Sequence, residues 1–239
     1  MFSERLPPSM KRLDLLPIAN QQEIIAYYQK QSKKPIDIWQ PQPKQELLLE
    51  LCGLREALTG GPVRPALAKY IGYGGAAGGG KTEGMIGACL IALATIPGVK
   101  IGYFRRKFTE LEGSDGPIER SQVLFPQIGG DYNKGKHIWR FGDQKSDDWN
   151  EGEAAAFRFC HCQYESDVYQ YQSSAFDIYC FDEATHFSWF QLRYLMTRNR
   201  ISKYSAIPRP FAIMCSNPGG VGHAWYKKIF DIKDMIYAN

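Results

Sequence analysis

The fold of this chain is constrained most by one string, Gly75-Ala76-Ala77-Gly78-Gly79-Gly80-Lys81-Thr82. It fits the pattern G-x-x-x-x-G-K-[ST], in which glycines allow successive backbone N–H groups to turn inward around an anion. A helix that follows such a loop presents free N–H groups and the positive end of its dipole to the same anion. An apolar run precedes the string and a longer one follows it. The segment is therefore predicted to be a phosphate-binding loop between a strand and a helix.

A second apolar run, at residues 176–181, ends in Asp182-Glu183. A strand that is buried on both faces delivers its last residues to the carboxyl edge of a parallel sheet. We expect Lys81 to meet the β- and γ-phosphates of a nucleotide, and Thr82 and Asp182 to hold Mg²⁺. Glu183 is then predicted to orient and deprotonate the attacking water. The expected activity is hydrolysis of ATP, with Mg²⁺ as the metal cofactor.

A third apolar run, at residues 210–215, ends in Ser216-Asn217 and continues into a Pro-Gly-Gly turn. A polar pair at the end of a strand beside the acidic one is predicted to contact the γ-phosphate or the lytic water. An ordinary transition from strand to turn is the alternative, because Asn-Pro-Gly sequences often end strands.

The order of the apolar runs predicts the fold class. Strands that alternate with helices indicate an α/β domain with a largely parallel central sheet flanked by helices. With the phosphate loop, this is a P-loop NTPase of the RecA/ASCE-like kind, with an antiparallel pair added to its sheet and a helical extension at its N-terminus. We expect residues 1–60 to form that extension and residues 61–239 the ATPase domain. The predicted helices are 20–31, 45–58, 82–95 and 189–196, and the predicted strands are 69–73, 99–104, 137–141, 155–162, 176–181 and 210–215.

Composition narrows the remaining classes of protein. A net charge of +4 over 239 residues permits a nucleic-acid partner but does not require one. The six cysteines are scattered, partly through apolar runs, which favours a reducing compartment over a disulfide scaffold. The first residues lack the apolar core of a signal peptide, and the longest apolar run, 85–97, is too short to span a bilayer. We expect a soluble protein without a membrane partner.

Several stretches of the sequence resemble those of one protein family: FDEATHF, TRNR, CSNPGGVGHAWYKKIF, GYFRRKFTELEGS and PQPKQELLLE. Over residues 36–230 the chain resembles the large terminase subunit of tailed bacteriophages. The resemblance implies an ATPase motor domain that drives translocation of double-stranded DNA into the viral capsid, in the cytoplasm of the infected bacterial host. It also implies a portal protein and a small terminase subunit as partners, and a homo-oligomeric ring as the active form.

The resemblance also assigns roles to individual residues. It implies that Gln45, in a Pro-Lys-Gln segment, contacts adenine, whose edge a side-chain amide can both donate to and accept from. Capping of the helix that begins there is the alternative. It further implies that Ser216 and Asn217 form a coupling motif between hydrolysis and DNA movement. It implies an arginine finger as well, and the candidates are Arg105, Arg106, Arg198 and Arg200, of which Arg106 and Arg200 are preferred.

The family's large subunit normally continues into a nuclease domain. We expect this chain to be an isolated motor domain without nuclease activity, and we expect its acidic segment to be a solvated loop rather than a two-metal centre. The acids in question are Asp143, Asp147, Asp148, Glu151 and Glu153. Two other functions stay open at this point. A helicase-like or other DNA-remodelling ATPase is suggested by the run from Asp182 to Thr185, and a nucleotide-binding scaffold that does not hydrolyse ATP is the third possibility.

Overall fold

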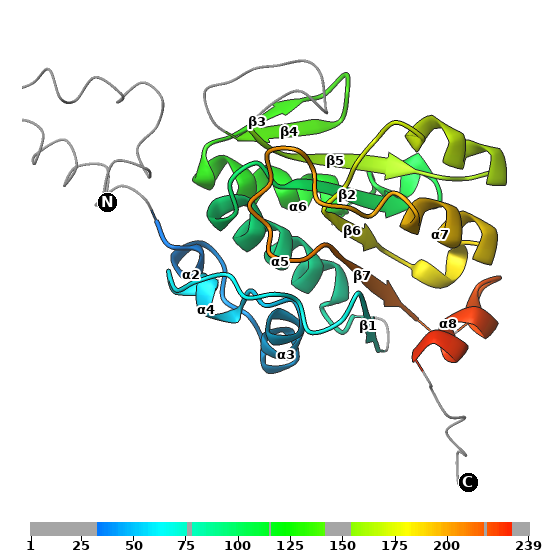
Figure 1. Cartoon of the computed structure of the whole chain (residues 1–239), viewed down its shortest axis with the longest axis horizontal. Helices are drawn as coiled ribbons and strands as arrows, with labels where there is room; N and C mark the ends of the chain where they lie inside the picture. Colours follow the sequence, from blue (N-terminus) through cyan, green and yellow to red (C-terminus); the bar gives the residue numbers. More distant parts are fainter. Residues whose placement is uncertain (1–32, 76–77, 115, 142–153, 218, 231–239) are drawn as a thin grey trace, which may run out of the picture.

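The computed structural model describes residues 33–75, 78–114, 116–141, 154–217 and 219–230. They form a seven-stranded sheet in the order β1-β7-β6-β2-β5-β4-β3 (Figure 1). The helix predicted at residues 20–31, the acidic segment with Asp143, Asp147, Asp148, Glu151 and Glu153, and the loop residues Ala76 and Ala77 lie outside the described residues.

Five neighbouring strands of the sheet run parallel, and two more extend it antiparallel at one side. The largely parallel sheet with an antiparallel addition is therefore confirmed. The parallel strands are β1 (Tyr70–Gly74), β7 (Phe211–Ser216), β6 (Ile178–Phe181), β2 (Lys100–Arg105) and β5 (Ala155–His161), and the antiparallel ones are β4 (Ile138–Phe141) and β3 (Gly130–Asn133).

Helices cover both faces of this sheet, and alternate residues of a strand serve the two sides. In β7, Phe211, Ile213 and Cys215 pack on the side of α5, whereas Ala212 and Met214 pack on the side of α7. Both faces are thus apolar, which explains why this strand has an unbroken apolar sequence. The α-helices are α2 (Pro35–Ile38), α3 (Pro43–Leu51), α4 (Arg55–Leu58), α5 (Lys81–Thr95), α6 (Pro117–Leu124), α7 (Trp189–Met196) and α8 (His223–Phe230).

Within the described residues, four short 3₁₀ segments connect these elements: η4 (Phe108–Glu110), η5 (Phe125–Ile128), η6 (Glu165–Tyr171) and η7 (Ala184–His186). Among the described helices, none has the length and apolar character needed to cross a membrane.

The helix predicted at residues 45–58 is two helices, α3 and α4, so that prediction was wrong. The chain turns at Gly53, whose φ is +69°. A Cβ atom at Gly53 would lie 2.2 Å from the carbonyl oxygen of Arg64, so the turn requires glycine. Leu48 and Leu54 are buried in the same core as α5. The described part of the N-terminal extension thus packs directly against the helix that follows the phosphate loop.

Candidate nucleotide-binding and hydrolysis site

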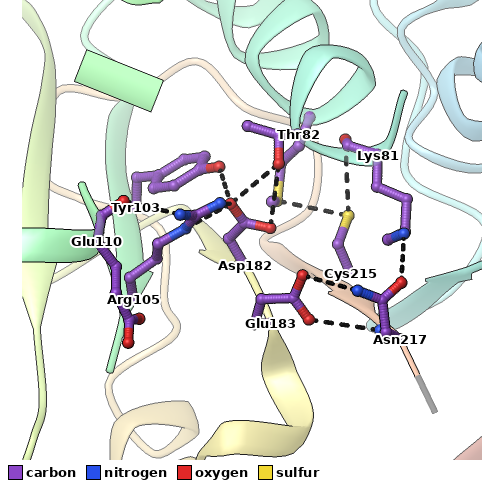
Figure 2. Close-up of polar contacts among 10 residues, drawn as sticks. Lys81, Thr82, Tyr103, Arg105, Glu110, Asp182, Glu183, Cys215 and Asn217 are labelled. Carbon is purple, nitrogen blue, oxygen red and sulfur yellow. Dashed lines mark hydrogen bonds and ion pairs between the residues drawn. The ribbon is translucent and has the colours of Figure 1, made fainter. Parts of the chain in front are cut away.

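Three segments with polar side chains meet at one edge of the sheet. β1 leads into the phosphate loop, β6 ends at Asp182-Glu183, and β7 ends at Ser216-Asn217. Since β7 pairs in parallel with both β1 and β6, the carboxyl ends of all three strands lie side by side. Figure 2 shows the side chains that this arrangement brings together.

Three described glycines of the predicted phosphate loop have backbone conformations that favour glycine. Gly75, Gly78 and Gly80 have φ values of +155°, +75° and +67°, which residues with a side chain rarely adopt. Gly80 is the N-cap of α5, and the helix begins at Lys81. Among the described residues, no atom lies within 4 Å of a Cβ position at Gly75 or at Gly78.

The side chain of Lys81 folds back over its own loop and is only 8% exposed. Its Nζ donates to the carbonyl oxygen of Gly75 at 3.0 Å and to Oδ1 of Asn217 at 2.7 Å. The ammonium therefore lies between the phosphate loop and the end of β7, where a phosphate oxygen could replace the amide oxygen as its partner.

Asp182 is 1% exposed and is held by several donors. Its Oδ2 accepts from the hydroxyl of Tyr103 at 2.7 Å and from Nε of Arg105 at 2.8 Å. The hydroxyl of Thr82 lies 3.2 Å from Oδ2 and 3.4 Å from Oδ1. A hydroxyl beside a carboxylate fits Mg²⁺, which takes oxygen ligands and often binds through one or two carboxylates and the phosphates of a substrate.

Two partners of Asp182 are hydrogen-bond donors that stay protonated beside its negative charge. Burial and the Asp182 carboxylate raise the pKa of Tyr103 well above its usual value, so the phenol stays protonated and donates. Burial opposes the charge of Arg105, but the neighbouring Asp182 raises its pKa overall. The NH1 group of Arg105 also donates to the carbonyl oxygen of Glu110 at 2.7 Å, which fixes the guanidinium at both ends.

Glu183 has a left-handed backbone conformation, with φ +52° and ψ +53°. Such conformations cost free energy in residues other than glycine and are concentrated at functional sites. Its Oε1 accepts from Nδ2 of Asn217 at 3.1 Å, and its Oε2 from the backbone N–H of Asn217 at 3.4 Å. One amide side chain thus connects Glu183 to Lys81 (Figure 2).

A second connection joins the ends of β6 and β7. The hydroxyls of Thr185 and Ser216 lie 2.7 Å apart, and both residues are buried. The backbone N–H of Thr185 also donates to Oγ of Ser216 at 3.3 Å. The two side chains of the predicted coupling pair therefore have different partners: Ser216 contacts Thr185, and Asn217 contacts Lys81 and Glu183.

A cavity of about 310 Å³ opens beside Glu183. Its volume exceeds that of several water molecules, which occupy about 30 Å³ each in the liquid. The lining is polar, as a route for water or phosphate requires. The lining residues are Arg105, Glu110, Glu183, Thr185, His186, Asn217, Gly219 and Gly220.

The candidate arginines are spread over the molecule. Arg105 lines the cavity, and Arg106 lies next to it, with NH1 donating to the carbonyl oxygen of His186 at 2.5 Å. Arg198 lies over the ring of Tyr194, 5.4 Å from its centroid. Arg200 is exposed, and its backbone N–H donates to the carbonyl oxygen of Phe176 just before β6 begins, at the opposite edge of the sheet. The structure therefore brings Arg105 and Arg106, but not Arg200, to the site.

Gln45 contacts the phosphate loop and is 2% exposed. Its Oε1 accepts from the backbone N–H of Gln42 at 2.8 Å, and its Nε2 donates to the carbonyl oxygen of Gly80 at 2.9 Å. The first contact caps α3, as the alternative interpretation expects. Contact with adenine stays a prediction.

Tyr103 and Thr185 hold polar residues of the site in place but were not predicted from the sequence. Tyr103 lies within an apolar strand, where a tyrosine reads as a core residue. Tyr103 lies two residues before Arg105, so both side chains lie on the face of β2 that also carries Ile101. This spacing is the feature of the sequence that could have identified Tyr103. Thr185 follows the acidic pair closely, and a buried hydroxyl there needs a partner from the next strand.

No protein-family model matches the sequence, and no curated protein sequence matches it. Solved structures do resemble the fold. The large terminase ATPase domain of Thermus phage P74-26 superposes with a TM-score of 0.52 at 14% identity, over 82% of this chain and 72% of that one. The bacteriophage HK97 large terminase gives 0.51 at 10% identity, over 84% of this chain and 41% of that one. A large terminase from a thermophilic bacteriophage, in complex with ADP, gives 0.51 at 15%, over 74% and 39%.

These likenesses establish the fold. The chain has the P-loop NTPase fold of phage large terminase ATPase domains, and the predicted fold class is confirmed. The chain spans about two fifths of the length of the two longer terminases, 41% and 39%.

Proposed function

We propose that this chain is the ATPase motor domain of a phage large terminase subunit, which hydrolyses ATP to drive double-stranded DNA into the viral capsid. One observation carries the proposal. Lys81, Thr82, Asp182, Glu183 and Asn217 converge at the carboxyl edge of a sheet whose fold is that of terminase ATPase domains. The thermophilic bacteriophage terminase in the ADP complex supports a nucleotide as the ligand of this edge.

The loop and the two strand ends divide the work of phosphoryl transfer. Backbone N–H groups at the start of α5 bind the phosphates, and Lys81 exchanges Asn217 for a γ-phosphate oxygen. Thr82 and Asp182 would hold Mg²⁺, with Asp182 kept in place by Tyr103 and Arg105. When bound, Mg²⁺ neutralises charge on the β- and γ-phosphates.

Glu183 accepts the proton of the attacking water. The water oxygen forms a bond to the γ-phosphorus as the bond to the β–γ bridging oxygen breaks, and ADP and phosphate leave. The amide of Asn217 holds the carboxylate of Glu183 at the edge of the cavity, where a water molecule has room. Because Asn217 also contacts Lys81, it can respond to the presence of the γ-phosphate.

The partners follow from the resemblance. Double-stranded DNA is the proposed substrate of the movement, and a portal protein and a small terminase subunit are the proposed protein partners in a homo-oligomeric ring. These partners are features of the whole terminase, of which the chain matches a part in the longer relatives.

A combined assay separates this function from its rivals. The purified chain is mixed with ATP and Mg²⁺, with or without linear duplex DNA, and phosphate release is measured together with displacement of a third strand and of one duplex strand. A duplex translocase is expected to hydrolyse ATP faster on DNA and to displace the third strand without opening the duplex. Separation of the duplex strands would favour a helicase-like ATPase, and absence of hydrolysis would favour a binding scaffold.

A further inference from the structure

A row of glycines at the start of α5 faces the N-terminal segment. Gly80, Gly84 and Gly87 are spaced at i, i+4 and i+7, which places them in one row along the helix. A Cβ atom at Gly84 would lie 3.0 Å from Cγ of Gln45, and one at Gly87 would lie 2.4 Å from the ring of Trp39. Glycine costs about 1 kcal/mol relative to alanine inside a helix, and at Gly84 and Gly87 the contacts with Gln45 and Trp39 give a packing reason for it. The row receives Trp39 and Gln45.

Polar contacts fix the same two side chains to α5. Nε1 of Trp39 donates to Oε1 of Glu83 at 2.8 Å, and Arg120 donates to both oxygens of Glu83 at 2.6 Å. Gln45 donates to the carbonyl oxygen of Gly80 at 2.9 Å. The N-terminal segment is thus attached at the first two turns of the helix that starts the phosphate loop's anion site.

The contact with Gly80 acts on the loop itself. The carbonyl oxygen of Gly80 accepts from the backbone N–H of Gly84 at 2.8 Å as well as from Gln45. Both donors hold this carbonyl on the helix side. Because the peptide unit is planar and trans, the N–H of Lys81 then points the opposite way, out of the start of the helix, where an anion binds.

We infer that Gln45 is a positioning residue of the phosphate loop, which orients the Gly80–Lys81 peptide for a polyphosphate whatever base the nucleotide carries. The amide oxygen of Gln45 accepts a hydrogen bond from the backbone N–H of Gln42, and the side chain of Gln45 packs against Gly84. The inference rests on the proposed function, since it assumes that the loop binds a nucleotide.

The test is a set of dissociation constants, measured by calorimetry for ATP, GTP and inorganic tripolyphosphate with Mg²⁺. Gln45→Met keeps the length of the side chain and removes its hydrogen bonds. One lost hydrogen bond is expected to weaken all three ligands about two- to tenfold, with the ratio of ATP to GTP affinity unchanged. Thermal unfolding is recorded in parallel, so that all binding is measured on folded protein.

Gln42→Pro is the matched control. It removes the N–H that Gln45 accepts from, at a φ of −74° that proline adopts, and leaves the donation to Gly80. It is expected to change the melting temperature but not the affinity for tripolyphosphate, which separates helix capping from the action on the loop.

If the wild-type protein binds nucleotide, two results would overturn the inference. Gln45→Met that loses affinity for ATP while GTP and tripolyphosphate bind as before would make Gln45 a reader of the base. Unchanged affinity for all three ligands would leave Gln45 without a role in the loop. Wild-type protein that binds none of the three would contradict the proposed function, and the inference with it.

Discussion

Asn217 links the two halves of the site at the scale of single residues. Its amide oxygen accepts from Lys81 at 2.7 Å, and its amide nitrogen donates to Glu183 at 3.1 Å. An amide can make both contacts because it has a donor and an acceptor, whereas a carboxylate has acceptors alone. The two contacts therefore fix which end of the amide faces which partner.

Asn217→Asp tests this arrangement. The new carboxylate gives Lys81 an anionic partner that competes with the γ-phosphate, and it places like charges beside Glu183. ATP affinity is expected to fall by at least about tenfold, because a partly buried charge pair must be broken for the phosphate to bind. Asn217→Ala, the control, is expected to bind ATP and to hydrolyse it slowly. Binding of a non-hydrolysable ATP analogue measures the affinity of the two variants, and phosphate release measures hydrolysis by Asn217→Ala. Wild-type affinity in Asn217→Asp would contradict the bridge.

The structure brings together the loop and the acids named from the sequence, because the carboxyl ends of parallel strands lie at the same edge of a sheet. The sequence could not predict which donors hold Asp182. Tyr103 and Arg105 come from β2, which is adjacent to β6 only because the sheet order places it there. The contact of Gln45 with Gly80 could not be predicted either. It depends on glycines at the start of α5, which in a sequence only indicate lower helix propensity.

At the scale of elements, the starts of β2 and β6 are joined by a buried polar group. Asp177 accepts from the backbone N–H of Lys100 and from that of Ser202, both at 2.6 Å. Lys100 is buried, and its Nζ donates to the carbonyl oxygen of Ala154 at 2.7 Å. Burial and the nearby Arg140 lower the pKa of Lys100 to about 8, although Asp177 opposes the shift.

This pKa predicts how stability depends on pH. The folded pKa of Lys100 lies below the value of about 10.4 for an unfolded lysine. Between these values the unfolded chain binds more protons, so this group's contribution to the free energy of unfolding rises with pH from about 8 to about 10.4. Lys100→Met is expected to flatten this rise in urea titrations, and Lys69→Met, at a lysine nearer the surface, is not. Parallel curves for Lys100→Met and wild type would contradict the assignment.

The glycine row of α5 gives a second prediction for an element. Gly87→Ala improves the helix propensity by about 1 kcal/mol but places a Cβ atom 2.4 Å from the ring of Trp39. Overpacking of this kind costs about 1–3 kcal/mol, so the melting temperature is expected to fall. Gly113→Ala, where no atom lies within 4 Å, is the control. A higher melting temperature for Gly87→Ala would show that Trp39 is not packed there.

Long apolar elements were predictable, and short or interrupted ones were not. α5, α7 and the buried strands are predominantly apolar in sequence, and the structure confirms them. β3 has the sequence Gly-Asp-Tyr-Asn and is half exposed, so its sequence has no apolar strand pattern. Its strand conformation depends on antiparallel pairing with β4. The break between α3 and α4 depends on the contact of Gly53 with Arg64, which a helical pattern does not contain.

At the scale of the whole molecule, Arg106 and Arg200 lie at opposite edges of the sheet. Arg106 lies beside the cavity, through its contact with His186, whereas Arg200 lies where β6 starts. Arg200 lies at the edge of the sheet away from the site, so it can reach a nucleotide only in a neighbouring copy. A ring of copies is therefore the setting in which Arg200 could act as a finger, and Arg106 could act within its own subunit or across to the next.

A finger supplied by a neighbour makes specific ATPase activity rise with protein concentration, since such an arginine adds about 10³–10⁵ in rate. We expect this rise, and we expect activity to return in part when Arg200→Ala is mixed with Glu183→Gln, because each protein supplies what the other lacks. Arg106→Ala, mixed in the same way, shows which arginine acts. Constant specific activity and no rescue, in a protein shown to oligomerise, would contradict the neighbour's role.

The most direct test of the account is phosphate release by wild-type protein and by Glu183→Gln, with ATP and Mg²⁺ in excess. The substituted amide retains the shape of the side chain but does not take a proton, so release is expected to fall by about 10²–10⁴-fold. The affinity for ATP should stay within a few-fold of wild type, because Lys81 and the loop bind the phosphates. Release by Glu183→Gln at the wild-type rate, or no release by the wild type, would contradict the assignment of this edge as an ATPase site.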